Sequence, residues 1–156
     1  MLTSFHEAFM RLMKRIAIPL VRISFFIVYF YFGLLKVLGY SPAEIIVKEL
    51  WSNTLAFIPF YNFLNIFGCY EMLIGIIFLI PGKERLALYL LIPHMITTFG
   101  PVVLLPKFIW KGFMVPSLAG QYIIKNLVIV ALGIAVAANI GDFRKKMKAG
   151  EQLKEE

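Results

Sequence analysis

The chain has 156 residues, 60% of them hydrophobic, with a net charge of +7 and a mean hydropathy of +0.81. Soluble domains are about 45–50% apolar, so this composition excludes an ordinary soluble domain and indicates a one-domain integral membrane protein. The basic residues lie in the termini and loops, which favours anionic lipid over nucleic acid as their partner. Cys69 is the single cysteine, which excludes an internal disulfide and a CxxC redox pair.

The sequence of the N-terminal region predicts a short surface helix followed by the first membrane span. Residues 2–15 form a short amphipathic helix, with basic residues at its end, that we expect on the cytoplasmic surface of the membrane. The first span follows over residues 16–38, and Pro19 falls in its first turn, where a missing N–H costs least. The apolar stretch is too long for a removable signal peptide, and no small-residue cleavage site follows it.

A polar segment separates the first span from the second. Ser41, Pro42 and Glu44 match a helix N-cap, a proline at the first helical position and a capping-box glutamate. They predict a short helix over residues 42–50 that lies at the membrane interface, where Trp51 suits the aromatic belt.

Three further spans are expected, over residues 61–80, 86–105 and 118–140. A tight turn joins the second span to the third, and Pro93 lies inside the third, where it is expected to kink the helix. Gly141 is expected to end the fourth span, leaving a charged cytoplasmic tail that is disordered beyond its first turn. The predicted fold is an all-α membrane protein, a four-transmembrane-helix bundle with a short interfacial helix between the first and second spans.

The distribution of Lys and Arg predicts the topology. Nine flank the side that holds both termini and the turn between the second and third spans, against three on the opposite side. Cytoplasmic flanks carry an excess of these residues, so both termini are expected in the cytoplasm, with the protein in the cell (inner) membrane. The larger set is Arg11, Lys14, Arg15, Lys83, Arg85, Arg144, Lys145, Lys146 and Lys148, and the smaller set is Lys48, Lys107 and Lys111.

Ionisable side chains inside the spans are the main functional signal. A charge at bilayer depth is costly, so it is retained mainly where it faces a bundle interior or a cavity, or reaches an interface. They predict a polar pocket between the helices, with Tyr29, Gln121 and Asn126 as secondary candidates. The primary candidates are Arg22, Lys36, Glu71, His94 and Lys125.

The charges expected in this pocket do not balance. Three cations and one carboxylate sum to +2 if all are ionised. We expect Glu71 to bridge to a lysine, and either Glu71 or a lipid phosphate to serve Arg22, which cannot lose its proton. A lysine left over is either neutral or holds an anionic or carbonyl-bearing ligand.

Simpler interpretations stand beside this one. Lys36 and Lys125 lie near helix ends and can extend to the headgroups, as can Arg22. His94 can donate to a backbone carbonyl and do nothing else, and a lone intramembrane histidine is a poor signal for a metal. Tyr29 is by default a packing residue.

Short motifs in each span give a family resemblance. They are Arg22 with Phe32-Gly33-Leu34-Leu35-Lys36, then Gly68-Cys69-Tyr70-Glu71-Met72-Leu73-Ile74-Gly75, then His94, and finally Gly120-Gln121-Tyr122-Ile123-Ile124-Lys125-Asn126. In these the chain resembles the DoxX-like family of small four-span membrane proteins over residues 16–140. The resemblance implies a quinone-linked or thiol-redox role, since some members are described as thiosulfate:quinone oxidoreductase subunits or as partners of membrane redox enzymes. The fold also resembles vitamin K epoxide reductases, whose paired cysteines this chain lacks.

Three functional hypotheses follow. The first is a binding or accessory subunit for membrane redox chemistry, with the polar pocket holding a quinone headgroup or a small anion and an enzyme activity implied by the resemblance alone. The second is a small proton-linked transporter that uses the same polar path. The third is a structural or partner-binding bundle whose charges only lock the helices together.

Overall fold

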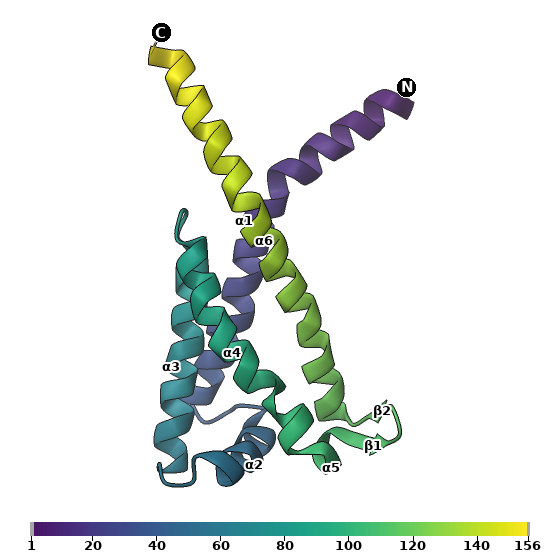
Figure 1. Ribbon diagram of the computed structural model, residues 1–156, viewed down its shortest axis with the longest axis vertical. Coiled ribbons are helices and arrows are strands. Elements are labelled where there is room, and N and C mark those ends of the chain that lie inside the picture. The colour runs from purple at the N-terminus through teal and green to yellow at the C-terminus, as the bar shows by residue number, and fades with distance from the viewer. Residues whose placement is uncertain (1, 156) are drawn as a thin grey trace.

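The computed structural model describes the backbone of residues 2–155 and the side chains of residues 5–138, which form six helices and one small hairpin (Figure 1). The helices are α1 (Leu2–Val37), α2 (Glu44–Thr54), α3 (Phe60–Leu79), α4 (Glu84–Leu104), α5 (Pro106–Ile109) and α6 (Leu118–Glu155). Strands β1 (Trp110–Gly112) and β2 (Val115–Pro116) pair antiparallel between α5 and α6.

Four helices in the described part of the chain are long and apolar enough to cross a membrane. They contribute Phe5–Val37 from α1, all of α3 and α4, and Leu118–Ala138 from α6. Each has at least the 20 residues that a hydrocarbon core of about 30 Å requires. This confirms the predicted all-helical, four-span membrane fold, and the second, third and fourth spans lie close to their expected positions.

The helices place both chain termini at one end of the molecule. α1 packs against α3, and α4 packs against both α3 and α6, while Figure 1 shows both chain termini at one end of this assembly. The turn between α3 and α4 lies at that same end, and α2, α5 and the hairpin lie at the other. The basic residues of the turn and of the N-terminal flank therefore share one side of the bundle.

The N-terminal part of the chain differs from the prediction. Residues 2–15 and the first span form one continuous helix, Leu2–Val37, so Pro19 lies inside α1 and not in the first turn of a separate span. Proline removes one backbone hydrogen-bond donor from a helix and favours a bend. The N-terminal portion of α1 bends away from the other helices (Figure 1).

The short helix between the first two spans begins and ends later than predicted. α2 starts at Glu44 with Ala43 at the N-cap position, so the assignment of Ser41 as the N-cap is wrong. The Ser41 hydroxyl instead accepts a hydrogen bond from the Ala43 N–H at 3.3 Å. Serine readily forms such a local turn, which competes with its use as a cap.

The last helix continues further than predicted. α6 runs without interruption through Gly141 to Glu155, so Gly141 does not end the fourth helix and the tail is helical rather than disordered. A glycine inside a helix costs only about 1 kcal/mol relative to alanine. The helix-forming Lys, Arg, Glu and Gln residues of the tail are sufficient reason for the helix to propagate past it.

Glycines allow α1 and α3 to pack at close range. A Cβ atom built on Gly33 would lie 2.5 Å from the Gly68 carbonyl oxygen, and one on Gly68 would lie 2.7 Å from the Gly33 carbonyl oxygen. Two turns further along α3, a Cβ on Gly75 would lie 2.9 Å from the Phe30 amide nitrogen. Small residues at membrane helix contacts permit such backbone approach, so the glycines on either side of Glu71 bring α3 close to α1.

An apolar core holds α4 against this pair. The Phe25 ring of α1 stacks on the Phe78 ring of α3 with centroids 4.0 Å apart. Side chains from α4 complete the cluster, which thus joins three of the four spans. Its buried members are Phe25, Tyr29, Ile74, Ile77, Phe78, Ala87, Leu91 and Met95.

We predict that Gly68→Ala lowers the free energy of unfolding by about 1–3 kcal/mol, because the new methyl group forces α1 and α3 apart. Gly100→Ala is the matched control, since its Cβ would meet its nearest neighbour, a Leu50 methyl, at an ordinary 3.9 Å. That variant should be neutral or more stable, because alanine favours helix more than glycine does. Unfolding in detergent measures both; equal effects of the two substitutions would contradict the close contact.

Candidate functional site

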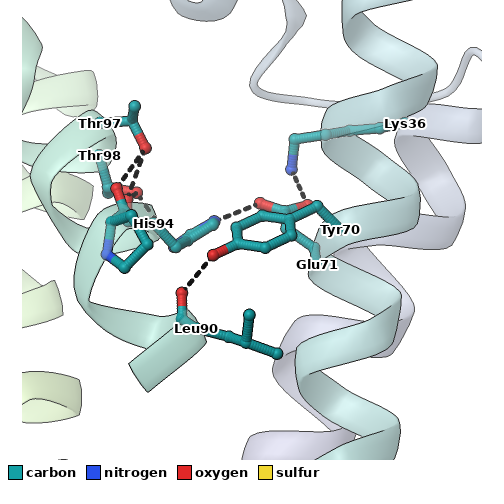
Figure 2. A network of polar contacts seen from close by, with 8 residues as sticks. Lys36, Tyr70, Glu71, Leu90, His94, Thr97 and Thr98 are labelled. Atoms are coloured by element: carbon teal, nitrogen blue, oxygen red, sulfur yellow. Dashed lines mark hydrogen bonds and ion pairs between the residues drawn. The ribbon is translucent and has the colours of Figure 1, made fainter. Parts of the chain in front are cut away.

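Glu71 is the centre of a buried polar cluster formed by three helices. Its Oε2 accepts a hydrogen bond from the Lys36 ammonium of α1 at 2.5 Å, and its Oε1 lies 2.9 Å from Nε2 of His94 on α4. Figure 2 shows the carboxylate of α3 held between these two partners. All three residues are 5–6% exposed. The predicted bridge from Glu71 to a lysine is therefore confirmed, with Lys36 as the lysine.

Aromatic rings enclose the cluster. The Phe67 ring stacks on the His94 ring with centroids 5.2 Å apart and planes 7° apart, and the Lys36 ammonium lies 5.6 Å from the Phe67 centroid. The Tyr29 ring meets the His94 ring edge-on at 5.1 Å. The Tyr70 hydroxyl donates to the Leu90 carbonyl at 2.5 Å, which ties α3 to α4 beside the cluster (Figure 2). These rings exclude solvent and strengthen every electrostatic contact inside.

Thr98 constrains the protons of His94. Its hydroxyl donates to the His94 carbonyl at 2.9 Å, and the same oxygen lies 3.4 Å from Nδ1 of the ring. Because that hydroxyl has one proton, Nδ1 must be the donor whenever the carbonyl bond is kept. Nε2 then faces Glu71 either as the N–H of an imidazolium or as the acceptor from a protonated carboxyl group, and in both states Lys36, Glu71 and His94 together carry a charge of +1. If the hydroxyl instead donates to Nδ1, the Nε2–H of a neutral His94 donates to the Glu71 carboxylate, and the cluster is neutral. The pair can therefore hold one exchangeable proton.

A second ion pair lies at the end of the bundle that holds the termini. The Arg22 guanidinium donates to Glu84, the first residue of α4, and the same carboxylate accepts from the Gly82 N–H at 3.1 Å. The expectation that Glu71 or a lipid phosphate serves Arg22 is therefore wrong. The signal that sequence reasoning missed was an acidic residue in the first turn of α4, directly after the Pro81-Gly82 turn.

The candidates on α6 lie outside the cluster. Gln121 and Lys125 are exposed, and Asn126 is half-buried. The Lys125 ammonium lies 5.5 Å from the centroid of the neighbouring Tyr122 ring. Lys125 is therefore not one of the interior charges, whereas Glu84 is. The expected net charge of +2 in the interior is wrong. Among the side chains described, the buried Lys36 is paired with the buried Glu71, and the half-buried Arg22 is paired with the buried Glu84.

Two buried polar atoms in the described residues have no hydrogen-bond partner, and both belong to α1. They are the Tyr29 hydroxyl and Nε of Arg22. Tyr29 is 3% exposed. Buried polar groups are nearly always bonded, so each such atom requires a reason.

An apolar groove of about 650 Å³ lies between α4 and α6. Its walls are aliphatic and aromatic side chains of the two helices, including Leu91 and Met95 of α4. His94 itself is not part of the wall. Within residues 5–138, no three His, Cys, Asp or Glu side chains come together as metal ligands.

Comparisons of the chain with protein-family models, curated proteins and solved structures give no match.

We predict that Glu71→Gln lowers the free energy of unfolding by about 3–5 kcal/mol, because it leaves the buried Lys36 ammonium without its carboxylate. Glu49→Gln is the control, since this carboxylate is exposed on α2 and its loss should change stability by less than about 0.5 kcal/mol. Adding Lys36→Met to Glu71→Gln should restore part of the loss, as contacting residues are not additive. A Glu71→Gln protein as stable as Glu49→Gln would mean that the cluster is not formed.

Proposed function

We propose that this chain is a multi-pass membrane protein of the DoxX-like type that serves as a binding or accessory subunit in membrane redox chemistry. In this proposal the Lys36–Glu71–His94 cluster binds a quinone headgroup and exchanges a proton with it. The observation that carries it is the position of Glu71, buried in a span between a lysine and a histidine. Ionisable groups at this depth are retained mainly for ion, proton or ligand chemistry.

The side chains present fit a quinone headgroup. Its carbonyl oxygens accept hydrogen bonds, and on reduction they take up protons. Lys36 has three N–H donors and is bonded to one carboxylate in the described residues, so donors remain. The buried Tyr29 hydroxyl is a further donor without a partner. The proton shared by Glu71 and His94 can be passed to a group bound beside them.

The balanced charges argue against a small anion as the ligand. With His94 neutral, each of these cations is paired to a carboxylate, and an added anion would bring an uncompensated charge into the bilayer core. An uncharged ligand with carbonyl oxygens avoids that cost. This is why we favour the quinone over the anion.

A proton-linked transporter is the second candidate. It is favoured by the second buried carboxylate, Glu84, which is paired with Arg22 at the end of the bundle that holds the termini. A proton path requires titratable groups at more than one depth, and Glu71 and Glu84 lie at two.

We further propose that the protein lies in the cell (inner) membrane with both termini in the cytoplasm. The basic residues of the α3–α4 turn and of the N-terminal flank support this orientation. α2 then lies at the opposite interface, where its Trp51 indole donates to the Ile58 carbonyl at 2.9 Å. A redox enzyme of the membrane would be its protein partner.

We predict that the purified protein binds a benzoquinone with a short alkyl tail, and that Glu71→Gln weakens this binding about tenfold or more, because the charge-assisted bonds that orient Lys36 and His94 are lost. Glu84→Gln is the matched control, since it also breaks a buried ion pair but at a different site. Equilibrium binding in detergent measures the Kd of each. No binding by the native protein, together with proton flux in liposomes that Glu71→Gln abolishes, would favour the transporter.

We predict that an impermeant maleimide labels Lys107→Cys in intact cells, and labels Lys83→Cys only after the membrane is opened. Both variants are made with Cys69→Ala, and both positions are exposed. The reverse pattern would contradict cytoplasmic termini, because the two residues lie at opposite ends of the bundle.

A further inference from the structure

The Tyr29 hydroxyl is an energetic anomaly in this core. Its residue is 3% exposed, and the oxygen has no partner among the described residues. A buried hydroxyl without a hydrogen bond costs stability, whereas a phenylalanine would fill the same space without that cost. The other atom in this condition, Nε of Arg22, belongs to a side chain that is 23% exposed and already paired with Glu84. Tyr29 therefore calls for an explanation more strongly than Arg22 does.

The position of Tyr29 connects it to the polar cluster. Its ring contacts the His94 ring edge-on at 5.1 Å. The Tyr29 ring also stacks on the Phe25 ring, with centroids 6.0 Å apart, and this apolar contact helps to fix its position. Tyr29 and Lys36 lie seven residues apart on α1 and so share one face of that helix. The unpartnered hydroxyl thus belongs to the face of α1 that also carries Lys36, and its ring lies against His94 of the cluster.

We propose that the Tyr29 hydroxyl is a ligand-binding group, which donates a hydrogen bond to an oxygen atom of an uncharged, lipid-soluble molecule held against the Lys36–Glu71–His94 cluster. This inference rests on the proposed function and names the residue that selects the ligand. A carbonyl oxygen, as in a quinone ring, satisfies the hydroxyl and adds no charge to a cluster that is already neutral when His94 is uncharged. A hydrocarbon would leave the hydroxyl unsatisfied, so the site should reject it.

The comparison of Tyr29→Phe with Tyr70→Phe tests this role. Tyr70 is the matched control because its hydroxyl lies beside the same cluster but already donates to the Leu90 carbonyl at 2.5 Å. Without ligand, Tyr29→Phe should be as stable as the native protein or more so, whereas Tyr70→Phe should be less stable. With a short-tailed benzoquinone as the probe, Tyr29→Phe should raise the Kd about tenfold, and Tyr70→Phe should leave it nearly unchanged.

The outcomes separate this inference from the proposed function. If the native protein binds the quinone and Tyr29→Phe binds it equally well, the inference is overturned while the proposed function stands, and the hydroxyl is then served by a buried water. If Tyr29→Phe is strongly destabilised without ligand, the hydroxyl has a structural partner and the inference also fails. If the native protein binds no quinone, the proposed function fails, and the inference that rests on it fails with it.

Discussion

The need to neutralise charge inside a bilayer governs this structure. Glu71 lies in the middle of α3, where an ionised carboxylate without partners would be strongly unfavourable. It is stable there because α1 supplies Lys36 and α4 supplies His94, both within hydrogen-bond distance. The same two contacts define which helices must be neighbours. The arrangement of three spans therefore follows in large part from the partners of a single side chain.

The glycine contact between α1 and α3 makes this pairing geometrically accessible. Lysine and glutamate side chains on facing helices bond directly only when the backbones lie close together. Gly33 and Gly68 provide that approach one turn away from Lys36 and Glu71, since a Cβ on either would overlap the opposite carbonyl oxygen. Backbone packing and charge pairing thus support each other, and the predicted cost of Gly68→Ala includes a weaker ion pair.

Hydropathy made the number and position of the spans predictable from the sequence, and the need to pair a charge at bilayer depth predicted the bridge from Glu71 to a lysine. Ion pairs between residues far apart in the sequence were harder to predict. Glu84 was not recognised as the partner of Arg22, because a carboxylate after a Pro-Gly turn resembles ordinary helix-start chemistry. Lys125 was placed inside because its helix is apolar, yet periodicity alone does not tell which face of α6 meets the bundle. Helix ends were also uncertain, as Gly141 and Pro19 show, because single breaking residues do not stop a helix that its neighbours favour.

The two buried ion pairs differ in a way that bears on function. Arg22 and Glu84 make a simple pair at the end of the bundle, with the arginine 23% exposed, and a lock between α1 and α4 needs nothing more. The inner cluster adds His94 to a pair that is already neutral, and encloses it in aromatic rings. An ion pair that only holds two helices together gains little from a third titratable group. The added proton site increases the number of charge states that must be accommodated inside the bilayer. A group that must accept and release a proton gains what that arrangement provides, a neighbouring carboxylate that stabilises the charged imidazole and a spare donor nearby. The presence of His94 is thus the reason to assign the inner cluster a chemical role and the outer pair a structural one.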